Sequence, residues 1–179
     1  VSQACSYQVG ISYLYGKYEM ALQYAEKKKD TDEKHLHGFR EFSRWVRCAY
    51  VFYDGLASLA LSRTSLDPKL TQRSQDAIDS MKTWAKLAPW NFEHKLELLL
   101  AEQAFAAGNY DAAFRSYGNG VNLAEKRGFV NEAAVAAECA FIFFKERGDY
   151  GLAEVYRSRA VELYGKWGAT AKVTRLRHS

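Results

Sequence analysis

One short phrase occurs three times in this sequence. It reads Gly, a polar residue, Tyr, two variable residues and Ala, and it covers residues 16–21, 108–113 and 148–153. Each copy follows one apolar stretch with helical spacing and precedes another, which is typical of a repeated helix–turn–helix unit. Glycine permits the tight turn between the helices because it adopts positive φ without steric cost. The phrase therefore predicts an all-α solenoid of antiparallel helix pairs.

Such units resemble tetratricopeptide repeats, and this resemblance implies that the chain binds other proteins.

The phrase also identifies the residues expected to pack each repeat. We expect the tyrosine ring to be buried in the angle between the two helices, and the alanine to keep the helix crossing close. The repeat-packing residues predicted in this way are Gly16, Tyr18, Ala21, Gly108, Tyr110, Ala113, Gly148, Tyr150 and Ala153.

Hydrophobic periodicity and turn signals divide the chain into about nine predicted helices. Asp67-Pro68 is typical of a helix start, and Pro89 is expected to end a helix before Asn91 caps the next. A polar run, 27–34, is expected to separate the first repeat from a long third helix. The predicted helices cover about residues 2–15, 18–29, 34–63, 68–87, 92–107, 110–127, 131–147 and 150–167, with a short ninth after Gly168.

These helices are expected to form one helical-repeat domain. The chain begins within a helical pattern and without an initiator Met, so we expect a fragment of a larger protein. The predicted parts are a first repeat at 1–30, an irregular long helix pair at 34–88, repeats at 91–127 and 130–167, and a terminal helix at 169–179.

Bulk properties favour a cytoplasmic protein that binds neither nucleic acid nor membrane. The net charge of +4 comes from the last seventeen residues, which hold four cations and no acid; a solvated basic end is a better reading than a nucleic-acid site. The three cysteines are isolated, which indicates reduced, buried thiols. No run of eighteen apolar residues is present.

The sequence holds no recognisable catalytic constellation, so we expect no enzymatic activity, no cofactor and no metal site in this chain. His94, beside Lys95, is more readily a structural residue than a catalytic one. Gly118 and Gly120 lack the Gly-Lys-Ser/Thr of a phosphate loop, and they are better explained by close helix packing. We therefore also expect the chain neither to bind nor to hydrolyse ATP.

Three arginines form the best candidate for a partner-binding surface. Arg40, Arg44 and Arg47 share one helix face at i, i+4 and i+7. Such a stripe suits an acidic partner segment or a phosphate, and the alternative is an ordinary solvated helix face.

The second half of the chain resembles a known family. The segments that carry the resemblance lie between Ala88 and Val173, and they are Ala88-Pro89-x-Asn91-Phe92-x-His94-Lys95, Gly128-Phe129-x-x-Glu132-Ala133, Glu138-x-Ala140 and Tyr164-x-x-Trp167-Gly168-Ala169-x-Ala171-Lys172-Val173. In this order and spacing they resemble the helical repeat region of large hybrid sensor histidine kinases of bacteria and fungi. In those proteins the region follows a protein-kinase-like domain and an AAA-type ATPase domain, and it precedes a GAF domain and a histidine kinase core.

The resemblance implies a place in a signalling chain. The family's catalytic motifs are absent from this sequence, so the resemblance implies no active-site residue. It also implies that Trp167 ends the last full repeat and is a repeat-packing residue. It implies a non-catalytic connector in a cytoplasmic phosphorelay that responds to stress. The expected partners are a response regulator, a kinase or another phosphorelay component, and the neighbouring domains of the parent chain. Two alternatives remain open: the helical repeat arm of an ATP-dependent transcription regulator, and a phosphotransfer domain that uses His94.

Overall fold

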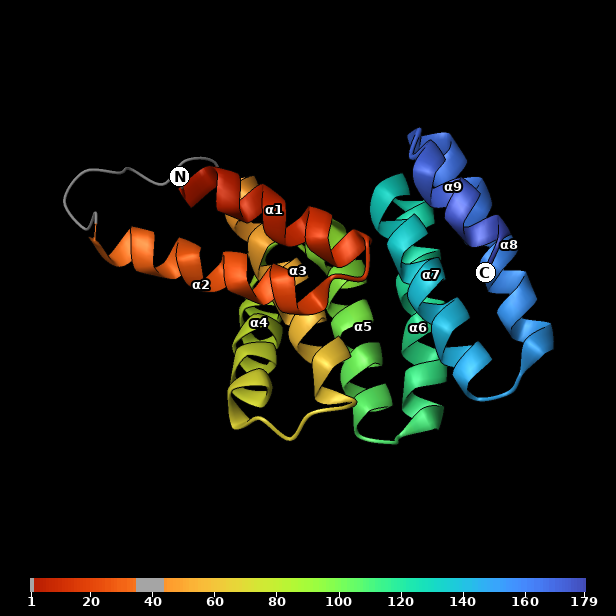
Figure 1. Cartoon of the computed structure of the whole chain (residues 1–179). Coiled ribbons are helices and arrows are strands. Elements are labelled where there is room, and N and C mark those ends of the chain that lie inside the picture. Colours follow the sequence, from red (N-terminus) through yellow and green to blue (C-terminus); the bar gives the residue numbers. More distant parts are fainter. Residues whose placement is uncertain (1, 35–43) are drawn as a thin grey trace. The chain divides into compact units, whose positions relative to one another are not determined.

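The structure is a computed structural model that describes residues 2–34 and 44–179 (Figure 1). Every regular element within these residues is a helix, which confirms the all-α prediction. The helices are α1 (Ser2–Leu14), α2 (Tyr18–Lys34), α3 (Arg44–Ser62), α4 (Pro68–Leu87), α5 (Pro89–Ala106), α6 (Tyr110–Lys126), α7 (Val130–Glu146), α8 (Tyr150–Trp167) and α9 (Thr170–Arg177).

The chain divides into two compact units, Val1–Met81 and Lys82–Ser179. In the first unit α1, α2 and α3 pack against one another. Its core includes Phe52, Leu56 and Ile78, all with less than 2% of their surface exposed. The Arg73 guanidinium on α4 lies 2.6 Å from the Asp54 carboxylate on α3, and it also pairs with Glu26 on α2.

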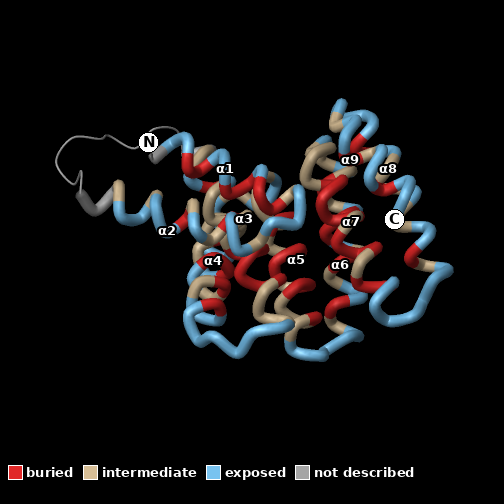
Figure 2. Tube along the Cα trace, in the orientation of Figure 1, coloured by how far each residue is buried: buried red, intermediate tan, exposed pale blue. Residues whose placement is uncertain are grey.

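In the second unit each helix from α5 to α9 packs against the next one along the chain, and α5 also contacts α7. Neighbouring helices in the chain are therefore neighbours in space, as expected for a stack of antiparallel pairs. Figure 2 shows α7 as buried over most of its length, and Ala133–Ala137 are all buried. This helix forms the centre of the second unit.

Four glycines at a constant spacing of 20 residues set the geometry of this stack. Gly108, Gly128, Gly148 and Gly168 have φ of 73°, 80°, 75° and 85°, and Gly16 in the first unit has φ of 70°. After each glycine, the next backbone N–H bonds back to a carbonyl five residues earlier, for example from Asn109 to Ala104 at 2.8 Å. This is the Schellman arrangement that ends a helix. The turn role predicted for Gly16, Gly108 and Gly148 is thus confirmed.

The polar residue after the glycine starts the next helix in two of the repeated phrases. The Asn109 side chain accepts a hydrogen bond from the Ala112 N–H at 3.3 Å, and Asp149 accepts one from Leu152 at 3.0 Å. Both are N-caps, so the phrase combines a helix stop and a helix start in two residues. The tyrosine that follows then occupies the first position of the new helix.

We predict opposite effects for two glycine substitutions in the second unit. Gly148→Ala should lower the free energy of unfolding by about 1–2 kcal/mol, because a Cβ is disfavoured at positive φ. Gly165→Ala, inside α8 with nothing within 4 Å of an added Cβ, should raise it by about 0.5–1 kcal/mol through helix propensity. Urea unfolding of the two variants measures both changes, and equal effects of the same sign would contradict the turn assignment.

Two predicted helix boundaries are wrong. The run 27–34 belongs to α2 instead of forming a polar separator. The start predicted for the third helix, near residue 34, borders a segment outside the described residues and stays a prediction. Pro89 begins α5 instead of ending α4, and Asn91 lies inside that helix without capping it. A proline at the first helical position loses no hydrogen bond, so α4 and α5 are separated by Ala88 alone. Asp67 does cap α4, accepting from the Lys69 N–H at 2.9 Å.

The packing interpretation of the glycines in α6 is confirmed at Gly120. A Cβ added there would lie 3.5 Å from the His94 carbonyl oxygen and 3.5 Å from the Leu98 backbone nitrogen on α5. These are ordinary van der Waals distances, so the backbones of α5 and α6 lie close together at Gly120, where an alanine would just touch α5.

Candidate protein interaction surface

One face of α6 carries an aromatic stripe that packs against α7 in the second unit. Its residues follow one another by four, three, four and three positions, so they share one helix face: Tyr110, Phe114, Tyr117, Val121 and Ala124. The face meets α7, where the Tyr117 and Phe143 ring centroids are 5.1 Å apart and those of Phe114 and Phe144 are 5.7 Å apart. Tyr117 and Val121, in the middle of the stripe, are fully buried.

The amino-terminal end of this stripe is exposed, which corrects the prediction that Tyr110 and Tyr150 are buried. Tyr110 is 40% exposed and Tyr150 is 72% exposed, and Tyr18 is intermediate. The physical reason is their position: Tyr110 and Tyr150 stand at the first residue of α6 and α8, at the end of the helix stack instead of the crossing. The alanines do lie in the packed region, since Ala21, Ala113 and Ala153 are all buried.

An arginine covers one of the exposed rings. The Arg147 guanidinium carbon lies 3.9 Å from the centre of the Tyr110 ring, within the range of a cation–π interaction. Arg147 caps the end of α7 and Tyr150 follows three residues later, so the three lie at the same end of neighbouring helices. Phe114, one turn into α6, is 51% exposed. We call Tyr110, Phe114, Arg147 and Tyr150 the aromatic edge.

Two other predicted site groups have different outcomes. Arg40 lies outside the described residues, as does the side chain of Arg44, and Arg47 is exposed on α3. The arginine stripe therefore stays a prediction. Trp167 is the last residue of α8, where it stacks on Tyr164 at 5.9 Å and remains 41% exposed.

Residues quoted above for the family resemblance meet in a first buried polar network, which joins α5 to α7. The Lys95 ammonium lies 3.1 Å from the Glu132 carboxylate, 3.0 Å from His94 Nε2 and 3.2 Å from the Asn91 carbonyl oxygen. An ammonium only donates hydrogen bonds, so His94 Nε2 accepts and the imidazole carries its proton on Nδ1. Phe129 covers the network, stacked on His94 at 4.5 Å.

A second buried network joins α7 to α8 and α9. Glu138 accepts a hydrogen bond from the Tyr164 hydroxyl at 2.6 Å, and it pairs with the Lys172 ammonium at 2.6 Å. Lys172 is only 4% exposed, so the expectation of a wholly solvated basic end is wrong at this residue. Glu132 and Glu138 each pair with a separate lysine, and the two networks tie successive repeats together.

His94 is a structural residue in this arrangement. It is 2% exposed, and among the described residues its Nδ1 has no hydrogen-bond partner. Burial, helped by the positive charges of Lys95 and Arg127, lowers the pKa of His94 from 6.5 to about 3. The imidazole is not accessible to another protein in this structure, and this burial argues against a phosphotransfer role for His94.

This low pKa predicts loss of stability in acid. Between pH 6.5 and about 3 the unfolded chain holds a proton on His94 that the folded chain does not, so the free energy of unfolding falls as the pH falls. Compared with His94→Gln, which does not titrate, the parent protein should lose about 2–3 kcal/mol more between pH 7 and pH 4.5. Urea unfolding at both pH values measures the difference, and equal losses in the two proteins would refute the burial of a neutral imidazole.

Neither a metal-binding group nor a membrane-spanning helix occurs in the described part of the chain. Residues 2–34 and 44–179 contain no group of three or more His, Cys, Asp or Glu side chains placed to hold a metal ion. None of the helices described has a stretch long and apolar enough to cross a bilayer. Cys5, Cys48 and Cys139 are all buried, which confirms that part of the prediction for the cysteines.

No protein-family model, no curated protein and no solved structure matches this sequence. A function for the chain is therefore argued from its own residues and their contacts.

Proposed function

We propose that this chain is a non-catalytic module that binds another protein and connects parts of a larger assembly. The observation that supports the proposal is the aromatic edge, where Tyr110, Phe114 and Tyr150 are 40%, 51% and 72% exposed. These side chains stand at the same end of the neighbouring helices α6 and α8, and exposed apolar side chains that gather in one region are typical of interaction sites. Tyrosine and arginine are also among the residue types that contribute most binding energy at protein interfaces.

The rigidity of the underlying helices supports the same proposal. Phe143 and Phe144, beneath the edge, are 2% and 3% exposed, and their rings are 5.0 Å apart. Exposed rings held over a packed core lose little conformational freedom when a partner binds, which favours affinity.

On the sequence resemblance alone, we propose a signalling context for the module. It would serve as a connector in a cytoplasmic hybrid sensor histidine kinase and dock a response regulator, a kinase or another phosphorelay component. Sequencing the gene on both sides tests this context: a GAF domain and a histidine kinase core after Ser179 supports it, and a DNA-binding helix-turn-helix there supports the transcription-regulator alternative.

Affinity capture with matched baits tests the binding function itself. The parent chain, Tyr110→Ser/Phe114→Ser, and the control Tyr7→Ser are used in parallel; Tyr7 is 56% exposed on α1, away from the edge in sequence. A partner captured by the parent is then purified, and its Kd for each bait is measured. We expect the double variant to bind at least tenfold more weakly and the control to bind as the parent does. If no captured protein distinguishes the two variants, the aromatic edge is not a binding surface.

The same capture experiment also tests whether the arginine stripe binds a partner. If Arg40, Arg44 and Arg47 dock an acidic partner, Arg40→Glu/Arg44→Glu/Arg47→Glu should abolish capture, and binding of the parent should weaken with salt because exposed charge pairs are screened. Unchanged capture by a folded triple variant identifies the stripe as a solvated face.

A further inference from the structure

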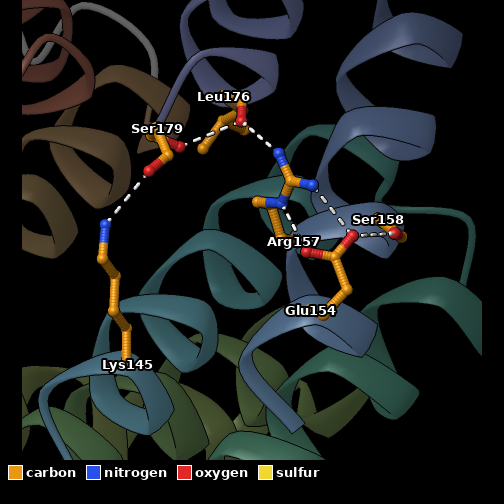
Figure 3. A network of polar contacts seen from close by, with 6 residues as sticks. All are labelled: Lys145, Glu154, Arg157, Ser158, Leu176 and Ser179. Carbon is orange, nitrogen blue, oxygen red and sulfur yellow. Dashed lines mark hydrogen bonds and ion pairs between the residues drawn. The ribbon is translucent and has the colours of Figure 1, made fainter. Parts of the chain in front are cut away.

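Many charged side chains on the surface of the second unit have a partner. Figure 3 shows one such set, in which Arg157 pairs with Glu154, and Lys145 donates to the Ser179 carbonyl oxygen at 3.2 Å. Two exposed lysines differ: Lys86 and Lys126 make no side-chain hydrogen bond, ion pair or ring contact within the described part of the chain. They stand in the last turns of α4 and α6.

The helix ends that carry these lysines meet at the junction between α4 and α5. The Arg127 guanidinium, one residue after Lys126, donates to the Pro89 carbonyl oxygen at 2.8 Å and lies 5.6 Å from the centre of the Trp90 ring. Lys86 stands four residues before Trp90, so the two Cα atoms are at most about 14 Å apart. The ends of α4 and α6 therefore both lie beside the first turn of α5.

This junction exposes two large apolar side chains, three residues apart. Leu87 is 81% exposed and Trp90 is 58% exposed. Arg127 is within cation–π range of the Trp90 ring, and this contact restrains the ring before any partner binds. We call Leu87, Trp90, Lys86 and Lys126 the tryptophan corner.

The tryptophan corner has an excess of positive charge. Residues 80–92 contain two lysines and no acid. The acids nearest to the corner already have partners, which are Arg127 for Glu93, Arg159 for Glu125 and Asn119 for Glu97. A complementary occupant therefore carries negative charge for the lysines and an apolar side chain for the exposed leucine and tryptophan.

We propose that the tryptophan corner binds an acidic segment of a partner protein. An apolar side chain of that segment packs on Leu87 and Trp90, and its carboxylates pair with the two lysines. Tryptophan is among the residue types that contribute most binding energy at protein interfaces. A protein fits better than a nucleic acid, because Leu87 offers no ring for base stacking and two lysines neutralise few phosphates. Arg127 is about 25 Å from Tyr110 along α6, so this site is separate from the aromatic edge.

Peptide selection tests the proposal without knowledge of the natural partner. A phage-displayed library of random twelve-residue peptides is depleted on Trp90→Ala and then selected on the parent chain of residues 1–179, so the peptides that remain depend on Trp90. We expect enrichment of aspartate and glutamate together with a large apolar residue. A selected peptide should bind Lys86→Gln/Lys126→Gln at least tenfold more weakly, and its affinity for the parent should fall as salt rises. The matched control is Lys29→Gln/Lys69→Gln, which loses two exposed lysines of the first unit and should bind as the parent does.

Several outcomes overturn the proposal. They are the absence of an enriched peptide, enrichment of basic or uncharged peptides, and unchanged binding to Lys86→Gln/Lys126→Gln. A single-stranded twelve-nucleotide DNA that binds the parent more tightly than the selected peptides do, but not Trp90→Ala, also overturns it, as does self-association that is lost in Trp90→Ala. Thermal unfolding confirms that each variant is folded, and Leu87→Ser replaces Trp90→Ala in the depletion if the latter unfolds. Because depletion removes ligands of the aromatic edge, failure of this selection leaves the proposed binding function untouched.

Discussion

Replacing Lys95 with methionine is expected to lower the free energy of unfolding by about 3–5 kcal/mol, the range found when one member of a buried ion pair is removed. The variant leaves the Glu132 carboxylate without its cation, in a place where both side chains are largely buried. It also removes the hydrogen bonds that Lys95 donates to His94 and to Asn91. Urea unfolding at neutral pH measures the loss.

Two control variants separate burial from charge. Lys95→Met/Glu132→Leu should recover most of the stability, because no uncompensated charge remains inside the protein. Lys166→Met breaks the pair of Lys166 with Glu162, whose side chains are both more than half exposed, and it should leave the stability nearly unchanged because solvent screens the pair. A loss from Lys95→Met as small as that from Lys166→Met would show that the α5–α7 network does not hold the repeats together.

The second large effect is expected from Phe143→Ala, which should lower the free energy of unfolding by about 3–5 kcal/mol through loss of burial and creation of a cavity. Phe143 is 2% exposed and its ring contacts Phe105 on α5 and Tyr117 on α6, with centroids 5.1 Å away in both cases. Phe114→Ala is the matched control, since its ring is half exposed and has less burial to lose. Chemical unfolding of the two variants should differ by at least about 2 kcal/mol, and equal losses would place the centre of the core elsewhere.

The repeated turns could be predicted from the sequence because their determinants are local. A glycine at positive φ followed by a capping side chain acts within a few residues, so the positions of Gly108, Gly148 and most helix ends follow from the printed phrase. Pro89 was misread because the same proline signal marks both a helix end and the first position of a new helix.

The burial of the tyrosines could not be predicted from the phrase alone. Whether a ring at the first position of a helix is covered depends on the length of the helix that packs across it. Arg147 at the end of α7 reaches Tyr110, whereas α9, the helix that packs on α8 after it, has only 8 residues. The aromatic stripe on α6 could not be recognised for a related reason. Its 4-3-4-3 spacing is visible in the sequence, but its ring partners on α7 are 26 and 30 residues away.

The two buried polar networks also escaped the sequence analysis. Lys95, Glu132, Glu138 and Lys172 all stand within segments quoted for the family resemblance, yet their pairing joins residues 34 to 37 positions apart. The constant 20-residue spacing of the glycines is the signal that could have found them. Because the turns are evenly spaced, the helices have nearly the same length. Two residues 34 to 37 positions apart therefore lie on helices that run in the same direction, at the same height in the stack.

The account's central claim is that a protein partner docks on the aromatic edge of the second unit. Hydrogen–deuterium exchange of the chain, alone and saturated with a partner purified by capture, tests this claim most directly. The account predicts slower exchange in the first turns of α6 and α8 and at the end of α7, and no change along α1. Protection confined to the first unit, or none anywhere, would contradict it.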